Sequence, residues 1–188
     1  MTWAYLALLA VVAVGRLLEL CISRRNQRTL EARGISKIHE PHFRWMVVVH
    51  AGVLGGAALE VTLLQRPILP ALAISMGALF VLANFLRWWV IRALAGHWNV
   101  EVMASPRLGV VTSGPYRWVR HPNYVAVVAE LFALPMIHTA WITALVGSAA
   151  NLEILRRRVR VEDGVLMSDA AYRMSMGAKP RFFPNWFQ

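Results

Sequence analysis

The sequence predicts an all-α integral membrane protein with about five membrane helices, the last two forming a bent hairpin. Three observations support this fold class. The chain is 57% hydrophobic with a mean hydropathy of +0.48, its apolar residues gather in long blocks, and its basic residues lie between those blocks. A helix needs about 20 apolar residues to cross a bilayer, and soluble domains are less apolar. Residues 1–188 are expected to form a single domain, with a three-helix membrane part in 1–95 and a second part in 96–188.

The first three expected helices occupy residues 3–22, 45–64 and 70–90, each about long enough for one crossing. The short link 65–69 predicts that the second and third helices are antiparallel neighbours. An Arg-Trp-Trp run at 87–89 is typical of an interfacial anchor at the end of the third helix.

The last apolar region, 124–155, is too short for two full crossings, which would need about 40 residues. Pro135 interrupts it, since proline breaks the helical hydrogen-bond pattern. We expect a short fourth helix, a bend over 135–139, and a fifth helix that runs past the bilayer to about Met167. A single re-entrant hairpin is the alternative.

Basic residues orient the chain. Six lie in residues 24–44, four in 92–120 and seven in 156–181, against one in the 65–69 link. The positive-inside rule then places both large loops and the C-terminus in the cytoplasm, as expected for a multi-pass protein of the cytoplasmic membrane. Because these charges flank apolar spans, membrane lipid is the expected partner and nucleic acid is not. A single cysteine and irregularly spaced histidines predict no metal site.

Several polar residues lie inside apolar spans, where they are costly unless they face protein. Arg16 and Glu19 share one helix face and could pair with each other or contact a substrate. Structural or interfacial roles are favoured for His50 and Glu60. Two further buried polar candidates remain open: Asn84 and Glu130.

Residues 113–124 form a polar and aromatic segment between two apolar blocks, which we call the polar knot. Gly114 and Pro115 predict a turn, and Pro122 predicts the first turn of a helix. Arg120 and His121 therefore lie where a loop becomes a helix. This placement suits a site where a polar ligand meets a lipophilic one; an anchor to lipid headgroups is the alternative.

A second charged cluster covers residues 156–163. Within it, Arg158 and Glu162 lie four residues apart on one helix face. They could form an ion pair on a solvated helix end, or they could face a charged cofactor. The aromatic and basic tail, 172–187, could lie on the membrane surface or fold back as a lid over the polar knot.

Together these segments resemble the isoprenylcysteine carboxyl methyltransferase and phospholipid methyltransferase superfamily. The resemblance rests on an ordered series: Gly-His-Trp at 96–98, Leu-Gly-Val-Val-Thr-Ser-Gly-Pro-Tyr at 108–116, Arg-His-Pro-Asn-Tyr at 120–124, Arg-Val-Arg-Val-Glu-Asp at 158–163, Tyr172, and Lys-Pro-Arg-Phe-Phe-Pro at 179–184. The family's usual Glu-Glu pair reads Glu162-Asp163 here, which shortens the second side chain. The N-terminal half resembles the small bacterial branch, whose members are associated with O-methylation of alkylpyrone and alkylresorcinol lipids.

The resemblance implies S-adenosylmethionine as methyl donor, with S-adenosylhomocysteine as product. It implies cofactor contacts from Glu101, Leu108, Gly109, Val110, Val111, Tyr116, His121, Pro122, Asn123, Tyr124 and Glu162. It places Arg158 at the reacting end of the substrate, and Arg120 and Arg181 where they could close the site. The 96–188 part would then be the cofactor-binding catalytic part of the chain, with its pocket at the cytoplasmic face.

The implied activity is methyl transfer to an oxygen (carboxylate, phenol or enol) of a lipophilic small molecule or a prenyl or acyl substrate. Two alternatives come from other classes of protein. One is an NADPH-dependent membrane reductase of the sterol-reductase type, which shares an Arg-His-Pro-x-Tyr element but is much longer. The other is a non-catalytic lipid-binding membrane protein, which would leave the order of the charged clusters unexplained.

Overall fold

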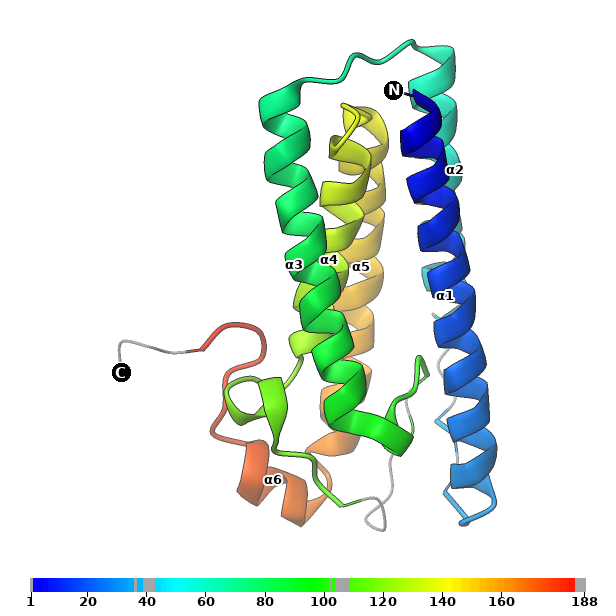
Figure 1. Cartoon of the computed structure of the whole chain (residues 1–188). Coiled ribbons are helices and arrows are strands. Elements are labelled where there is room, and N and C mark those ends of the chain that lie inside the picture. The colour runs from blue at the N-terminus through cyan, green and yellow to red at the C-terminus, as the bar shows by residue number, and fades with distance from the viewer. Residues whose placement is uncertain (1, 36, 39–42, 102, 104–108, 185–188) are drawn as a thin grey trace.

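The structure is a computed structural model that describes residues 2–35, 37–38, 43–101, 103 and 109–184. The described residues form helices, with one isolated β-bridge between Lys37 and Met103. The elements, in chain order, are α1 (Thr2–Glu31), α2 (Phe43–Leu63), α3 (Pro70–Leu94), η1 (Ala95–His97), η3 (Gly114–Arg117), α4 (Pro122–Met136), α5 (Trp141–Leu166) and α6 (Ala170–Met176). Helices α1–α5 stand side by side as an upright bundle, and α6 lies beneath it (Figure 1).

The first three predicted helices are confirmed, and α1, α2 and α3 are each long and apolar enough to cross a membrane. Helix α1 runs past its apolar block to Glu31, because residues 23–31 contain neither proline nor glycine. It ends where Gly34 adopts a φ of 76° and the amide of Ile35 turns back to bond the carbonyl of Leu30 at 3.1 Å. That return bond is a common helix C-terminal motif that requires a left-handed residue.

The bent hairpin is also confirmed as two helices, α4 and α5, joined by a turn at 137–140. Pro122 opens α4, and Pro135 lies in its last turn. The turn reaches the α2–α3 link, since the Thr139 hydroxyl donates to the carbonyl of Pro67 at 2.6 Å. The hairpin therefore extends to the same end of the bundle as that link.

A carboxylate from α2 helps to hold this end together. Glu60 is buried, and its carboxylate accepts hydrogen bonds from the backbone amides of Ile142 and Thr143, in the first turn of α5, at 3.2 and 2.8 Å. Arg66 donates to the same carboxylate at 3.1 Å. A negative charge at a helix N-terminus satisfies amides that have no partner within the helix. Glu60 thus has the structural role that the sequence favoured.

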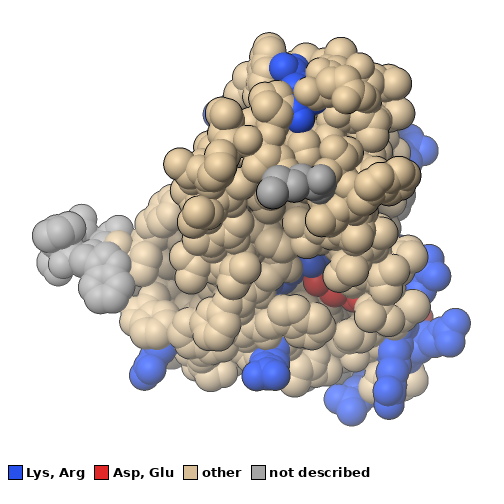
Figure 2. Space-filling model, turned by 45° about the horizontal axis from the view of Figure 1, so that its top comes forward, with Lys and Arg blue, Asp and Glu red and all other residues tan. Residues whose placement is uncertain are grey.

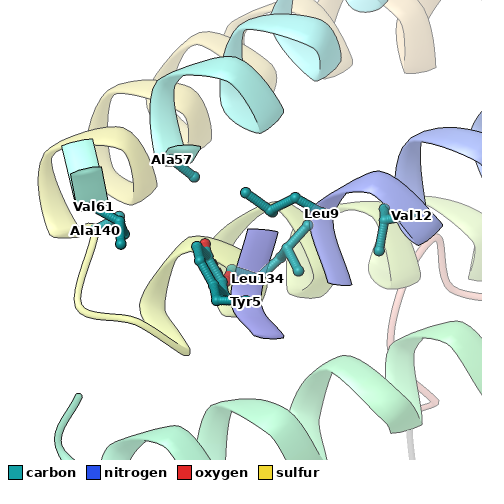
Figure 3. Close-up of a cluster of buried hydrophobic side chains, with 7 residues drawn as sticks. All are labelled: Tyr5, Leu9, Val12, Ala57, Val61, Leu134 and Ala140. Atoms are coloured by element: carbon teal, nitrogen blue, oxygen red, sulfur yellow. Dashed lines mark hydrogen bonds between the residues drawn. The ribbon is translucent and has the colours of Figure 1, made fainter. Parts of the chain in front are cut away.

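The hydrophobic core lies between α1, α2 and the hairpin. Figure 3 shows the principal cluster, to which the three segments contribute Tyr5, Leu9, Val12, Ala57, Val61, Leu134 and Ala140. The Tyr5 hydroxyl donates to the carbonyl of Leu134 at 3.1 Å. Helices α2 and α5 approach closely at Gly147, where a Cβ atom would lie 2.4 Å from a methyl group of Val53.

A buried charge cluster joins α1, α3 and α4 within the bundle. Arg87 donates to Glu19 at 2.9–3.0 Å and to Glu130 at 3.1 Å, and Arg16 bonds Glu19 at 2.9 Å. Arg16 also donates to Asn84 at 3.3 Å. The interfacial anchor predicted at 87–89 is therefore wrong for Arg87, which is 6% exposed, because two carboxylates from neighbouring helices neutralise it inside the bundle.

The loops after α1 and α3 and the C-terminal tail lie at one end of the bundle (Figure 1). In Figure 2 most Lys and Arg atoms lie along that edge, while the face above it is largely uncharged, with a hollow in which acidic and basic atoms are visible. The expectation that the polar knot and the tail share one end is thus confirmed.

Candidate active site

A cavity of about 370 Å³ opens at the basic end and extends between α2, α3, α4 and α5. This volume falls within the range of about 300–1,000 Å³ typical of small-molecule sites. The predicted site residues that line it are Glu101, Gly109, Val110, Val111, Tyr116, Arg120, His121, Asn123, Tyr124, Arg158 and Glu162. Of the other two, Pro122 is buried at the start of α4 and outside the lining, and Leu108 lies outside the described residues.

Tyr124 connects the polar knot to the second charged cluster. Its hydroxyl accepts a hydrogen bond from Arg158 Nε at 2.8 Å and donates to Glu162 Oε2. Its ring stacks on the imidazole of His121 with centroids 5.4 Å apart. Arg158 and Glu162 share one face of α5, as the sequence indicates, and that face is turned to the cavity rather than to solvent.

Arg158 is held from three sides. Besides Tyr124, its guanidinium donates to Met46 Sδ on α2 at 3.3 Å and to the carbonyl of Val100. The residue is buried. A planar guanidinium with several fixed hydrogen bonds loses little further freedom when a ligand binds, so Arg158 presents a positive charge in a defined position on the cavity wall.

Asp163 is a functional candidate whose role the sequence left open. Its Oδ1 accepts from Arg120 at 3.0 Å and from His121 Nε2 at 2.8 Å, and its Oδ2 accepts from Arg181 at 2.7 Å. Burial raises the pKa of Asp163, but the hydrogen bond and charge of His121, with Arg120 and Arg181, hold the pKa below its ordinary value. The sequence signal that could have identified Asp163 is an acidic residue within the strongly basic segment 156–163.

The tail folds back over the polar knot, which is one of its two predicted placements. The backbone amides of Arg120 and His121 donate to the carbonyls of Pro180 and Arg181 at 3.0 and 2.8 Å. Lys179 Nζ donates to the carbonyl of Tyr116 at 2.8 Å. With Nε2 bonded to Asp163 and its amide bonded to the tail, His121 connects the polar knot to α5 and to the tail.

The negative charge of Glu162 is felt across the cavity. Burial, followed by the charge of Glu162, raises the pKa of Tyr116 well above its ordinary value. The same two causes raise the pKa of Tyr172 to about 12. A carboxylate that disfavours phenolate in two tyrosines also favours a cation in the cavity that all three residues line.

Four buried polar atoms that line this cavity have no hydrogen-bond partner among the described residues. They are Trp98 Nε1, Arg120 Nε, Asn123 Oδ1 and Asn151 Nδ2. Buried polar atoms in folded proteins are nearly always paired with protein, water or a ligand, so these donors and acceptors are open to water or to a polar ligand in the cavity. A ligand with both an ammonium and a carboxylate, such as S-adenosylmethionine, fits this mixed set of groups.

Some lining residues were not assigned to the site from sequence. Met46 and His50 on α2, Arg87 on α3 and Asn151 on α5 all face the same cavity. Among them only His50 carried a sequence signal, an imidazole in an apolar span. Within the described part of the chain, no cluster of His, Cys, Asp and Glu could hold a metal ion.

Comparison with known proteins identifies the family. Residues 74–168 match the model of the isoprenylcysteine carboxyl methyltransferase (ICMT) family. The chain is 27% identical over 159 residues to the uncharacterized protein YpbQ of Bacillus subtilis, covering 85% of this chain and 94% of that protein. It is 27% identical over 158 residues to an uncharacterized protein of Haemophilus influenzae, covering 84% of this chain and 91% of that protein. The chain therefore belongs to the isoprenylcysteine carboxyl methyltransferase family, a family of membrane methyltransferases.

Proposed function

We propose that the protein transfers a methyl group from S-adenosylmethionine to an oxygen of a lipophilic acceptor at the cytoplasmic face of the membrane. The observation that carries the proposal is one cavity that combines Glu162, Tyr124 and Arg158 with four buried polar atoms that have no hydrogen-bond partner in the described part of the chain. That cavity opens at the basic end and runs inward between apolar helices. A charged donor and a lipophilic acceptor can thus meet in it from two sides.

The donor binds at the outer part of the cavity. Gly109, Val110 and Val111 offer backbone groups beside Tyr116. Asn123 Oδ1 is available to an ammonium group and Trp98 Nε1 to an acceptor oxygen. Glu162 holds the positive part of the donor, whose sulfonium supplies an activated methyl group.

The acceptor enters from the lipid side, and Arg158 faces its reacting oxygen. A guanidinium in a water-poor site stabilises negative charge that develops on that oxygen as it attacks. Fixing the two reactants in line supplies a further large part of the acceleration. In this proposal α4 and α5 complete five membrane helices with the C-terminus inside, and Asp163 holds the tail over the donor.

Calorimetric binding of S-adenosylhomocysteine to detergent-solubilised protein tests the proposal. Glu162→Ala should weaken binding by about 30-fold, the value of a hydrogen bond to a charged group. Glu153→Ala is the matched control, because Glu153 lies on the same helix but is exposed and pairs with the exposed Arg157. Folded wild-type protein that does not bind S-adenosylhomocysteine would refute the methyltransferase assignment.

A labelled-methyl assay over a lipid extract then tests the role of Arg158. Arg158→Lys keeps the charge but loses the fixed fork of hydrogen bonds, so turnover should fall by about 100-fold while S-adenosylhomocysteine affinity changes little. Arg157→Lys, at an exposed neighbouring position, should behave as wild type. Equal turnover in the two variants would contradict the assignment.

A further inference from the structure

Helix α1 supports the cavity without lining it. Every residue of α1 is described, and none of them belongs to the cavity wall. The segment after α3, residues 95–101, which we call the wall loop, turns toward the C-terminal part of α1 (Figure 1). Its residues 97–101 line the cavity. Contacts between α1 and the wall loop therefore reach the cavity indirectly.

Ser23 of α1 fixes the end of the wall loop through both hydrogen-bonding functions of its hydroxyl. The residue is fully buried. Its hydroxyl accepts from the backbone amide of Val100 at 3.0 Å and donates to Asn99 Oδ1 at 3.3 Å. A backbone amide withdrawn from water costs free energy when it has no acceptor. Ser23 therefore determines where Val100 lies.

The carbonyl of the same residue holds the guanidinium of the proposed active site. The Val100 carbonyl accepts a hydrogen bond from Arg158, which faces the acceptor in the proposed reaction. Val100 is thus bonded to α1 through its amide and to α5 through its carbonyl. Because the two groups flank one Cα atom, a shift of Val100 away from Ser23 also moves the oxygen that fixes Arg158.

Asn26, one turn after Ser23 on the same face of α1, fixes the beginning of the wall loop. Its Nδ2 donates to the carbonyls of Trp98 at 2.8 Å and Ala95 at 3.3 Å. Ala95 has a φ of 47° and a ψ of −120°, a conformation that persists only where neighbouring groups hold it. Trp98 is buried, and its Nε1 is one of the open donors of the cavity. Asn26 therefore affects the part of the wall that faces the donor.

We propose that Ser23 and Asn26 are positioning residues for two different parts of the reaction. Ser23 acts through Val100 on Arg158, and so on turnover. Asn26 acts through Trp98, and so on donor binding. The inference rests on the proposed methyltransferase function and extends it to a helix that touches neither reactant. A pair with a merely structural role would lower binding and turnover together, so the two effects can be measured apart.

Calorimetry with S-adenosylhomocysteine tests the role of Asn26 and needs no acceptor. Asn26→Asp keeps the shape of the side chain but replaces the donating amide by a carboxylate, which only accepts and repels the two loop carbonyls. Binding should weaken by about 10-fold, the value of one hydrogen bond, because Trp98 is no longer fixed. Gln27→Glu adds the same charge at the next position of α1 and should bind as wild type.

Transfer of a labelled methyl group tests the role of Ser23, with S-adenosylmethionine at saturation and a total lipid extract of the source cells as the probe. Ser23→Ala should lower turnover by about 10-fold, while S-adenosylhomocysteine affinity stays within about twofold of wild type. Ser75→Ala, at an exposed serine of α3 that bonds a carbonyl of its own helix, should behave as wild type. If Ser23→Ala does not fold, Ser23→Cys gives the same test, because a thiol fills a similar space but bonds weakly.

A double-mutant cycle shows whether Ser23 acts through Arg158. In an Arg158→Lys background the guanidinium that Val100 holds is gone. Ser23→Ala should then change turnover by less than about twofold, against about 10-fold in the wild-type background. Effects that multiply in the double variant would overturn the assigned route.

The remaining outcomes separate this inference from the function on which it rests. Wild-type affinity for S-adenosylhomocysteine in Asn26→Asp would overturn the donor half, and equal losses of binding and turnover in Ser23→Ala would overturn the acceptor half. Normal binding by wild type in the same experiments would show that the proposed function stands and only the positioning roles fail. Failure of folded wild type to bind would refute the proposed function and the inference with it.

Discussion

Nε2 of His121 lies 2.8 Å from Oδ1 of Asp163, which joins the start of α4 to the C-terminal part of α5. Because Arg120 and Arg181 bond the same carboxylate, one buried acid organises three basic residues from the polar knot and the tail. The cover over the cavity therefore depends on a residue that is only one position away from the cavity carboxylate of Glu162.

Replacing Asp163 by Asn should lower the free energy of unfolding by about 2–3 kcal/mol, since three basic groups lose their shared charge. The folded-state pKa of Asp163 is depressed, so its contribution is fully present above the unfolded value of about 3.9 and is lost as the pH falls through the folded-state pKa. Thermal unfolding in detergent should show a smaller acid-induced loss in Asp163→Asn than in wild type. Glu153→Gln, at an exposed position, should not change the midpoint at neutral pH by a comparable amount.

Replacing Tyr124 by Phe removes the hydroxyl between Arg158 and Glu162. We expect a fall in methyl-transfer turnover of about 30-fold, because both side chains lose a partner that fixes them. Tyr5→Phe removes a hydroxyl that bonds the carbonyl of Leu134 elsewhere in the bundle. Each variant should lose about 1 kcal/mol of stability, but only Tyr124→Phe should lose turnover; equal turnover in the two would refute this role.

Replacing Arg87 by Met should destabilise the bundle by about 3–5 kcal/mol, because Glu19 and Glu130 would remain buried without their principal cation. The midpoint of chemical or thermal unfolding in detergent measures this effect. Arg92→Met, at an exposed position on the same helix, is the control and should change stability by less than about 0.5 kcal/mol. A comparable loss in both variants would show that the charge cluster is not the cause.

Replacing Gly147 by Ala should cost about 1–3 kcal/mol, because the new Cβ would lie 2.4 Å from Val53 Cγ2. Val53→Ala in the same chain should remove part of that cost, so the two changes should be non-additive. Gly55→Ala is the control: among the described residues, no atom beyond the glycine's own turn of helix lies within 4 Å of a Cβ at that position, and alanine has the better helix propensity. Additive effects of the paired changes would exclude a direct clash.

The lengths of the apolar blocks were enough to predict the long helices. A helix in a membrane makes all its backbone hydrogen bonds internally, and its apolar run must match the thickness of the bilayer, so the sequence shows its approximate length. The break near Pro135 and the start at Pro122 follow from local chemistry in the same way. The order of the short motifs from residue 96 onward was sufficient to identify the family to which the chain belongs. The functional division of the chain at residue 95 stays a prediction, although Met46, His50 and Arg87 from the first part also line the cavity.

Partners distant in sequence were decided only by the tertiary structure. Arg87 precedes two tryptophans, and this pattern predicted an anchor at the membrane surface. In the structure it is hydrogen-bonded to Glu19 and Glu130 inside the bundle. From the sequence, Asp163 is only the shorter second member of an acidic pair. In the structure three basic side chains are hydrogen-bonded to it. The physical reason is that the cost of a buried charge depends on what surrounds it, and those surroundings come from helices that only packing brings together.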